Sequence, residues 1–547
     1  MCQGTPNYAP AMLTLLALLA CDGPPKTGDS SADSGSGPPQ LCSLPTTIDF
    51  GTVPVGTGAT SALTLGNCGG GTVTISDARI SGSTRFSTDS TVLTSLEAGH
   101  SIEALVTYSP VTTYGDNARL TLTTNDPAAA LVTIGLDGNG DYTFPTEQLW
   151  NAGTDDWEPF VAAKHGIVAE VTTRISTTDS YIAVRTSTDG GVTFSPDQRL
   201  EPDGVIGYDP QIAIAKDTGS LYALWLGDNW DTHFLRSDDG GATWTDPVNI
   251  APNWSTDHGF LAVSDDGQDV YVGWNGSTLD DYNAGLTDWR GYVSASHDGG
   301  VTWGDPWVVG DGGDYYWFQT AATIAPSGDV YFAASEYTHD YSGPTHLGVW
   351  RSTDKGATFT VDTFDSAGSP PTCEWAEGCA TGFFASQVGM TADAAGALTV
   401  LYQYSANDGD PQAMLVRTSP GGDAWQDWSD PVTVSTTTEH NGFPSVAAGP
   451  TAGDVRLLWQ GSVPGDPTHF NTWTDHTTDG GLTWDASPTR LSDDPGSAVY
   501  KSPDGYPFPY GDYVSVAIDD DGVAHTIWGE SPGYDGPGGT WDAVIAP

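Results

Sequence analysis

The sequence predicts an all-β protein. Its 547 residues include 68 glycines, 20 tryptophans and 22 tyrosines, and no long stretch shows the periodicity of an amphipathic helix. Short apolar segments alternate with clusters of Gly, Asp and Asn, which is typical of strands joined by tight turns. A phrase of the form "SDDGGATW" recurs along most of the chain and indicates a repeat architecture. A chain of this length has room for two or three domains.

The charge of the chain excludes one class of partner. Its formal net charge is −53, from 70 acidic and 17 basic residues. Such a surface repels nucleic-acid phosphates and anionic lipid, so we expect no nucleic-acid binding and membrane contact only through an anchor. The simplest role of the charge is solubility, and we expect a monomer.

The N-terminal residues predict export. The apolar run "AMLTLLALLAC" is too short to span a bilayer and suits a signal peptide over residues 1–20. Its end, Leu18-Leu19-Ala20-Cys21, resembles the lipobox of bacterial lipoproteins, although no Lys or Arg precedes the run. The resemblance implies lipidation of Cys21 and anchoring to the cell envelope, at the outer membrane, in the periplasm or on the cell surface. Residues 21–43 then form a flexible tether rich in Pro, Gly and Ser.

Four further cysteines fall as two local pairs, Cys42 with Cys68 and Cys373 with Cys379. Two disulfides in an oxidising compartment explain this pattern. A zinc site would need tighter clustering or supporting histidines.

Residues 44–140 predict a β-sandwich. The segments "IDFGTVPVG", "LEAGHS", "YSP" and "LTTNDP" resemble immunoglobulin-like domains of the abnormal-spindle/hydin type. The resemblance implies a spacer or adhesion module without catalysis.

The repeated phrase resembles the Asp-box, or bacterial neuraminidase repeat, of sialidase-like β-propellers. Its copies begin at Ser187, Ser237, Ser296, Ser352 and Thr477, with a worn copy at Ser419. In that family the phrase is the turn between the third and fourth strands of a blade, away from the ligand face. The carboxylate and hydroxyl of such a turn can accept its own N–H groups. We therefore expect structural roles for Asp189, Asp239, Asp298, Asp354 and Asp479.

Residues 144–547 are expected to form a seven-bladed propeller. Seven strand pairs can be counted, from "PFVAAKHGIVAEVTT" to "VSVAIDDDGVAHTIW", and the last unit lacks a fourth strand. Residues 146–159 resemble a fourth strand with its exit loop, so the N-terminal strand would close the ring. Six blades are the alternative, since sialidases usually have six.

Alignment of the seven units predicts a polar ring at the mouth of the central channel. The ring consists of Glu158, Asp209, His258, Gln319, Ser386, Asn441 with Gly442, and Asp512 with Tyr513. Such a ring suits a binding pocket and equally a solvated funnel. The loops between second and third strands mix aromatic residues with Asp, Asn and His. These aromatics either stack on sugar rings or pack between loops. Oxygen-rich loops such as Asp280 with Asp281 could hold Ca²⁺, and no other cofactor is expected.

Three functions remain open. The first, which we favour, is a non-catalytic adhesion or scaffold module that binds an extracellular glycan or a surface protein. Its ligand-binding candidates are Glu158, His258, Gln319, Asn441, Arg290 and Trp230. The second is a sialidase-superfamily glycoside hydrolase or lyase. Its catalytic candidates are Asp512, Tyr513, Glu530 and Asp209.

The third function is exo-α-sialidase activity. The family holds the substrate carboxylate with three arginines, a role that suits the bidentate guanidinium. In this chain most arginines lie in the sandwich or beside the repeated turns, and the Arg-Ile-Pro motif of sialidases is absent. The acidic composition would also repel sialic acid. These observations argue against this function.

Overall fold

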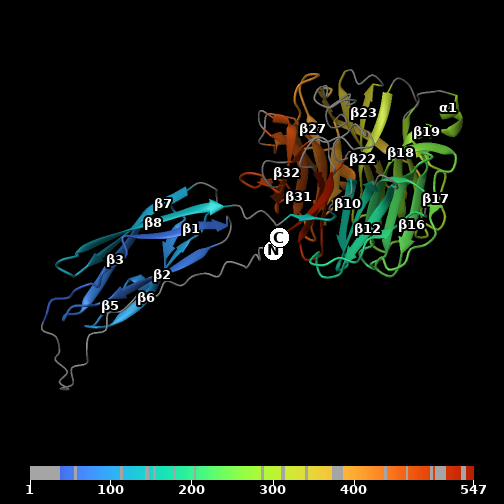
Figure 1. Cartoon of the computed structure of the whole chain (residues 1–547). Coiled ribbons are helices and arrows are strands. Elements are labelled where there is room, and N and C mark those ends of the chain that lie inside the picture. Colours follow the sequence, from blue (N-terminus) through green and yellow to red (C-terminus); the bar gives the residue numbers. More distant parts are fainter. Residues whose placement is uncertain are drawn as a thin grey trace, which may run out of the picture. The chain divides into compact units, whose positions relative to one another are not determined.

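The structure is a computed structural model in which the chain forms two compact units, Met1–Tyr142 and Thr143–Pro547 (Figure 1). The described residues are 37–54, 58–110, 115–141, 147–151, 155–175, 180–202, 205–284, 289–309, 315–338, 343–371, 386–435, 440–463, 466–492, 497–498, 513–530 and 538–547. The predicted signal segment, Cys21, Cys373, Cys379 and Asp512 lie outside them. Strands dominate the described residues, whose helices are α1 (Leu279–Asn283), η1 (Ser90–Val92) and η3 (Gly422–Ala424). The all-β prediction is confirmed.

The first unit is built from two sheets. One has the strand order β1-β8-β7-β3-β5 and the other β2-β6-β4. β1 pairs with β8 in parallel, and the remaining pairs are antiparallel. The strands are β1 (Thr47–Pro54), β2 (Ala59–Gly66), β3 (Val73–Gly82), β4 (Phe86–Thr88), β5 (Ser95–Leu96), β6 (Ser101–Tyr108), β7 (Gly115–Thr124) and β8 (Leu131–Asp141).

The apolar residues of these strands form one core. Strand β6 shows the pattern, because Ala104, Val106 and Tyr108 are buried while the residues between them are more exposed. The Tyr108 ring stacks on Phe86 with 4.6 Å between centroids. Gly138 lies against this ring, and a Cβ there would lie 2.6 Å from the Tyr108 Cε1 atom. The alternation therefore produces a sandwich with a dry interior.

The Cys42–Cys68 disulfide predicted from the sequence is confirmed. It fastens the segment before β1 to the end of β2, where the Cys42 N–H also donates to the Gly66 carbonyl (2.8 Å). Replacing both cysteines with serine is expected to lower the free energy of unfolding of the first unit by about 3 kcal/mol. The bridge closes a loop with a sequence separation of 26, which restricts the unfolded chain. Calorimetry of the full chain should show a lower first-unit transition, and a shift confined to the second unit would contradict the expectation.

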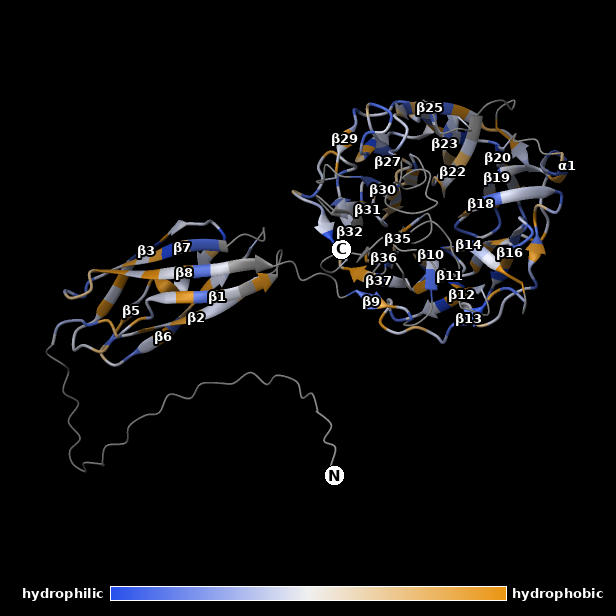
Figure 2. Cartoon of the chain, turned by 45° about the horizontal axis from the view of Figure 1, so that its top comes forward, coloured by the Kyte–Doolittle hydropathy of each residue, from blue (hydrophilic) through white to orange (hydrophobic). Residues whose placement is uncertain are grey.

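The described residues of the second unit form seven antiparallel sheets arranged in a ring, which is the architecture of a β-propeller (Figure 2). Neighbouring first strands contact one another around the axis, and β35 contacts β10 to complete the circle. In order from the axis outward, the sheets are β10 (Asp155–Lys164), β11 (Ile167–Ile175), β12 (Ser180–Ser187), β13 (Gln198–Arg199); β14 (Gly207–Ile214), β15 (Leu221–Gly227), β16 (Thr232–Ser237), β17 (Val248–Asn249); β18 (Trp254–Val263), β19 (Val270–Thr278), β20 (Arg290–Ser296), β21 (Trp307–Val308); β22 (Tyr315–Ile324), β23 (Val330–Thr338), β24 (Thr345–Ser352), β25 (Thr360–Ala367); β26 (Val388–Ala392), β27 (Leu398–Tyr404), β28 (Ala413–Ser419), β29 (Val432–Thr433); β30 (Asn441–Ala448), β31 (Val455–Val463), β32 (Asp466–Thr477), β33 (Thr489–Arg490), with β34 (Ser497–Ala498) beside β32; and β35 (Ser515–Ile518), β36 (Ala524–Glu530), β37 (Gly539–Ile545), β9 (Gln148–Leu149).

The second strand of each sheet lies in the interior of the ring. Four of these strands carry a fully buried tryptophan, namely Trp225, Trp274, Trp459 and Trp528. Because each sheet packs between two neighbours, both faces of its second strand are covered, and β15 is buried along its whole length. This explains why β15, with the sequence LYALWLG, is a continuous apolar run rather than an alternating one.

The ring closes between the last sheet and the first. Strand β9, which precedes the first sheet in the chain, pairs with β37. At this closure the Arg185 Nε atom lies 2.7 Å from the Glu170 carboxylate, and its NH2 atom lies 2.6 Å from that of Asp542. The guanidinium also packs over the rings of Trp150 (4.4 Å) and Phe194 (4.0 Å). A buried ionic cluster thus joins the two ends of the propeller sequence.

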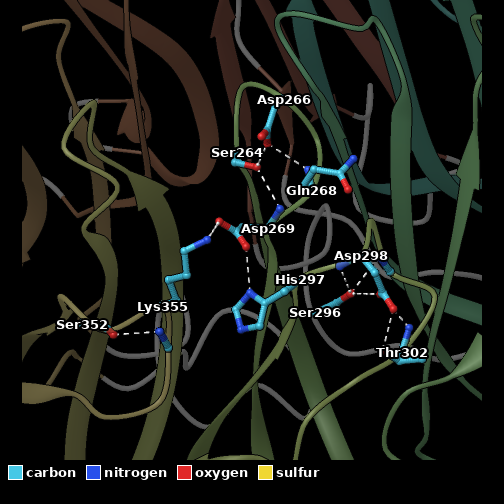
Figure 3. Close-up of polar contacts among 12 residues, drawn as sticks. Ser264, Asp266, Gln268, Asp269, Ser296, His297, Asp298, Thr302, Ser352 and Lys355 are labelled. Atoms are coloured by element: carbon cyan, nitrogen blue, oxygen red, sulfur yellow. Dashed lines mark hydrogen bonds and ion pairs between the residues drawn. The ribbon is translucent and has the colours of Figure 1, made fainter.

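The five repeated turns share one hydrogen-bond pattern, which Figure 3 shows for the third. The Ser296 hydroxyl donates to Asp298 (2.8 Å) and accepts from the Gly300 N–H (2.9 Å). Asp298 also accepts from the N–H (2.8 Å) and the hydroxyl (2.6 Å) of Thr302. These bonds lower the pKa of Asp298 to about 2, the largest contribution coming from the Thr302 hydroxyl. The equivalent bonds occur at Asp189, Asp239, Asp354 and Asp479.

The turns lie at one end of the ring. Gly299 N–H donates to the Gln268 carbonyl in the β18–β19 hairpin (2.9 Å), and Asp269 of this hairpin binds both His297 and Lys355 at 2.8 Å (Figure 3). Residue 258, by contrast, lies in the middle of β18, five residues before the strand ends at this hairpin. The repeated turns are therefore remote from the predicted channel mouth.

Candidate functional site

Three of the predicted mouth residues share an unusual backbone with Phe443, which the sequence did not predict. Glu158, Asp209, His258 and Phe443 are non-glycine residues with φ between 49° and 56°, the left-handed region. Each lies where the pairing of the first and second strands shifts register, so each belongs to a β-bulge. All four are buried. The same unfavourable conformation therefore recurs in four sheets. Its recurrence indicates a structural feature that these sheets share, and not strain at one residue.

Hydrogen bonds join this ring across three sheets. One Glu158 oxygen accepts from the Thr173 hydroxyl (2.9 Å) and from the Asp209 N–H (2.9 Å) of the next sheet. The Tyr513 hydroxyl of the last sheet donates to the Pro210 carbonyl (3.1 Å). Glu158 therefore supports the bulge of its neighbour, a positioning role that occupies one of its oxygens.

Aromatic side chains narrow the axis. The His258 ring lies 5.3 Å from that of Tyr513, edge to face, and 4.7 Å from that of Phe318. His258 and Tyr513 help to line a cavity of about 100 Å³, to which all seven sheets contribute residues, among them Phe160 and Gln211. No Arg or Lys is among the described residues that line it. The axis is thus constricted at this level and lined by both polar and apolar side chains.

Polar side chains two positions after the ring residues tie neighbouring sheets together. Gln211 accepts from the Leu261 N–H (3.1 Å), Ser445 from the Val516 N–H (3.2 Å) and Ser515 from the Val161 N–H (3.2 Å). Sequence reasoning did not single out these residues. A signal was available for two of them, because Gln211 and Ser515 each follow a predicted mouth residue by two positions.

Several other predicted site residues do not line this cavity, or their side chains lie outside the described residues. Asn441 is buried at the start of β30, where its side-chain amide donates to the Gln412 carbonyl (3.0 Å). Phe443, not Asn441 or Gly442, holds the left-handed position of that sheet. Glu530 is buried at the end of β36 and accepts from the Trp528 indole (2.9 Å). Ser386 accepts from the Gln412 amide (2.6 Å). The Gln319 side chain lies outside the described residues.

The arginines that the sequence places on the ligand side of the sheets form contacts outside the axial cavity. Arg174 is buried and forms ion pairs with Asp156 (2.9 Å) and Asp197. These hydrogen bonds raise its pKa although burial opposes them. Arg199 lies over the Tyr181 ring (5.1 Å) and donates to the Val205 carbonyl (2.8 Å). Arg290 begins β20 and is half-buried. The described arginines therefore form no cluster among the cavity-lining residues.

Two aromatic side chains are exposed on the loops that join second to third strands. Trp230, between β15 and β16, is 47% exposed, and Tyr282 of α1, between β19 and β20, is 48% exposed. They are the only aromatic residues among the exposed large hydrophobic side chains in the described part of the chain. Helix α1 lies at the upper edge of the ring in Figure 1, at the end opposite the repeated turns.

The described residues contain no group of three or more His, Cys, Asp or Glu side chains placed to hold a metal ion. Within the same residues, no helix has the length and apolar character needed to span a bilayer.

Comparison with known proteins shows that the first unit resembles a known family. For the fold of the second unit, the comparison finds solved structures of low sequence identity. Residues 39–130 match the family described as "ASH: Abnormal spindle-like microcephaly-assoc'd, ASPM-SPD-2-Hydin", in agreement with the predicted immunoglobulin-like domain. No curated protein matches the chain.

Three solved structures illustrate the distance of the structural relatives. A protein of unknown function from Dyadobacter fermentans is 18% identical, with a TM-score of 0.41 over 61% of this chain and 99% of that one. An ulvan lyase of polysaccharide lyase family 25 is 13% identical, with a TM-score of 0.44 over 72% and 95%. The intramolecular trans-sialidase from Ruminococcus gnavus is 13% identical, with a TM-score of 0.38 over 74% and 98%. These similarities are too low to transfer an activity to this chain.

Proposed function

We propose that the second unit binds a glycan without catalysis, on the loop face that carries Trp230 and Tyr282. The observation that carries this proposal is the exposure of two aromatic side chains on neighbouring loops of this face. Aromatic faces stack on sugar rings while the polar group of a Trp or Tyr stays in water.

The backbone of Trp230 supports a role in presentation. Its φ is 58°, an unfavourable conformation for a bulky side chain. Its carbonyl is nonetheless held by the N–H (2.7 Å) and the hydroxyl (3.2 Å) of Thr256 in the next sheet. The Trp230 N–H donates to the Gly227 carbonyl (3.0 Å), which closes the turn. The turn is rigid at its base and holds the indole out to solvent.

Tyr282 lies near the same strand entry. Thr256, which holds Trp230, is three residues after Asn253, whose carbonyl accepts from the Leu279 N–H at the start of α1 (2.9 Å). Three residues of extended chain span at most about 10 Å. The two aromatic loops therefore rest on one short segment, close enough for neighbouring units of one extended glycan chain.

The charge favours a ligand that is not anionic. The chain carries a net charge of −53, and no Arg or Lys lines the described part of the axial cavity. A glycan with carboxylate or sulfate groups would be repelled by this field. We therefore place neutral glycans ahead of sialosides as ligands.

Substituting Trp230 with glycine tests the proposal. Loss of the indole is expected to abolish retention of the wild-type protein's glycan in affinity electrophoresis against neutral polysaccharides. The same change relieves the positive φ, so the free energy of unfolding should rise by about 0.5–1 kcal/mol or stay unchanged. The variant should therefore lose glycan binding while its folded structure stays at least as stable as that of the wild type.

Trp244 supplies the matched control, because it lies beside a repeated turn at the other end of the same sheet. Trp244→Phe should leave retention unchanged. Retention that survives Trp230→Gly at wild-type strength would overturn the assignment of this face.

A second candidate function is a glycoside hydrolase or lyase, and the contact between His258 and Tyr513 favours it. An imidazole and a phenol side by side can move protons in bond cleavage. Incubation of the full chain with the same polysaccharides, read by mass spectrometry, tests it. Products that vanish with Tyr513→Phe would make this chain an enzyme, whereas retention without products supports the binding function.

We further propose that the propeller has seven blades and that the protein is held on the cell envelope by lipid on Cys21. The seven sheets with their closure by β9 support the first point, and the sequence Leu18-Leu19-Ala20-Cys21 supports the second. Metabolic labelling with a lipid precursor, compared with Cys21→Ser, tests the anchor.

A further inference from the structure

The loops that carry the exposed aromatics also carry carboxylates. Asp228 precedes Trp230 by two residues and is exposed, and Asp280 precedes Tyr282 by two residues and is also exposed. Asp281, beside them, accepts from the Thr278 hydroxyl (2.7 Å) and is only partly exposed. In each loop an exposed carboxylate thus precedes an exposed aromatic residue by two positions.

An aromatic side chain together with a carboxylate favours a cationic ligand over a neutral one. A protonated amine is attracted by an aromatic face through the cation–π interaction and by a carboxylate through charge. A neutral sugar would use the aromatic face alone. Arg290 begins β20 at the end of the α1 loop and would oppose a cation, but the aspartates of the two loops outnumber it.

We infer that the Trp230 and Tyr282 loops prefer glycans that carry protonated amines, such as β-linked glucosamine oligomers, over neutral glycans of the same backbone. The inference rests on the proposed glycan-binding function of this face and adds the ligand class to it. The net charge of −53 acts in the same direction, because it concentrates cations near the whole surface. An experiment must therefore separate the attraction of a cation to these two loops from its attraction to the acidic surface as a whole.

Three oligosaccharides of equal length distinguish the alternatives: cellohexaose, its N-acetylglucosamine counterpart and its glucosamine counterpart. We expect the full chain at about pH 5.5, where the sugar amines are protonated, to bind the glucosamine oligomer about tenfold more tightly than cellohexaose in calorimetric titration. Acetylation of the amines should remove this gain. The preference should shrink at 1 M NaCl, where the screening length falls to about 3 Å.

Charge-neutral variants assign the preference to the two loops. Asp228→Asn combined with Asp280→Asn should reduce the tenfold preference to less than about threefold, while cellohexaose binding stays unchanged. The control is Asp246→Asn combined with Asp305→Asn, which removes two exposed carboxylates beside the repeated turns at the other end of the same two sheets. The control should keep the full preference.

The outcomes distinguish a failure of this inference from a failure of the proposed glycan-binding function. Binding of none of the three oligomers would overturn both this inference and, for this backbone, the proposed function. Equal binding of all three would overturn this inference alone. An equal loss of preference in both double variants, or glucosamine binding that survives Trp230→Gly, would show general attraction to an acidic surface and would also overturn it.

Discussion

Replacing Arg185 with methionine is expected to lower the free energy of unfolding of the second unit by about 3–5 kcal/mol at pH 8. The guanidinium joins Glu170 of the first sheet to Asp542 of the last, and all three side chains are nearly inaccessible to solvent. Methionine preserves much of the packing against Trp150 and Phe194 but leaves the carboxyl groups of Glu170 and Asp542 buried without their cation. Breaking a buried ion pair from one side is among the most destabilising single changes.

Thermal or denaturant unfolding of the full chain measures this effect. Arg79→Met is the control, because Arg79 pairs with Asp77 while its side chain is 80% exposed, and such pairs contribute about 0–1 kcal/mol. The loss caused by Arg185→Met should shrink at pH 5, since the two carboxyl groups can then be neutral. A loss under about 1 kcal/mol at pH 8 would mean that the closure does not depend on this cluster.

The arrangement of strands was largely predictable because it follows from local patterns. Short apolar runs between Gly and Asp turns identify strands, and the repeated phrase marks the same turn in five of the seven sheets. The hydroxyl of Ser296 and the carboxylate of Asp298 bind within their own turn, so the seven residues from Ser296 to Thr302 contain these bonds. The pairing of β9 with β37 was predictable by counting strands, since the last unit lacks one.

The candidate site was less predictable because it depends on backbone conformation. Sequence alignment selected Asn441 and Gly442 for the sixth sheet, yet the bulge places Phe443 at the left-handed position, and a shift of one residue changes which side chain faces which way. The engagement of Glu158 by Thr173 and by the Asp209 N–H requires two bulges to lie side by side, which no single repeat encodes. Trp230 was selected by its loop composition, but its exposure and positive φ became visible only in the structure.

Acidification from pH 8 to pH 5 is expected to raise the free energy of unfolding of the second unit by roughly 2–4 kcal/mol. Burial raises the pKa of Glu170 from 4.5 to about 8, and Asp542 beside it adds to this shift while Arg185 opposes it. Burial likewise raises the pKa of Asp475 from 3.8 to about 7. The folded chain therefore binds these protons more tightly than the unfolded chain. The resulting stabilisation is complete below the unfolded pKa values and is lost as pH rises through the folded ones.

Glu170→Gln isolates the main contributor to this pH dependence. Glutamine keeps the shape and a hydrogen bond to Arg185 but does not titrate, so the variant should lose part of the increase on acidification. Asp189→Asn serves as a reference, because the turn hydrogen bonds lower the pKa of Asp189 to about 2 and it stays ionised over this range. Unfolding curves of the three proteins at pH 5, 6, 7 and 8 provide the comparison. A wild-type stability that falls between pH 8 and pH 5 would show that Glu170 and Asp475 are ionised in the folded protein, with Arg185 holding Glu170 charged, and that burial does not set their protonation.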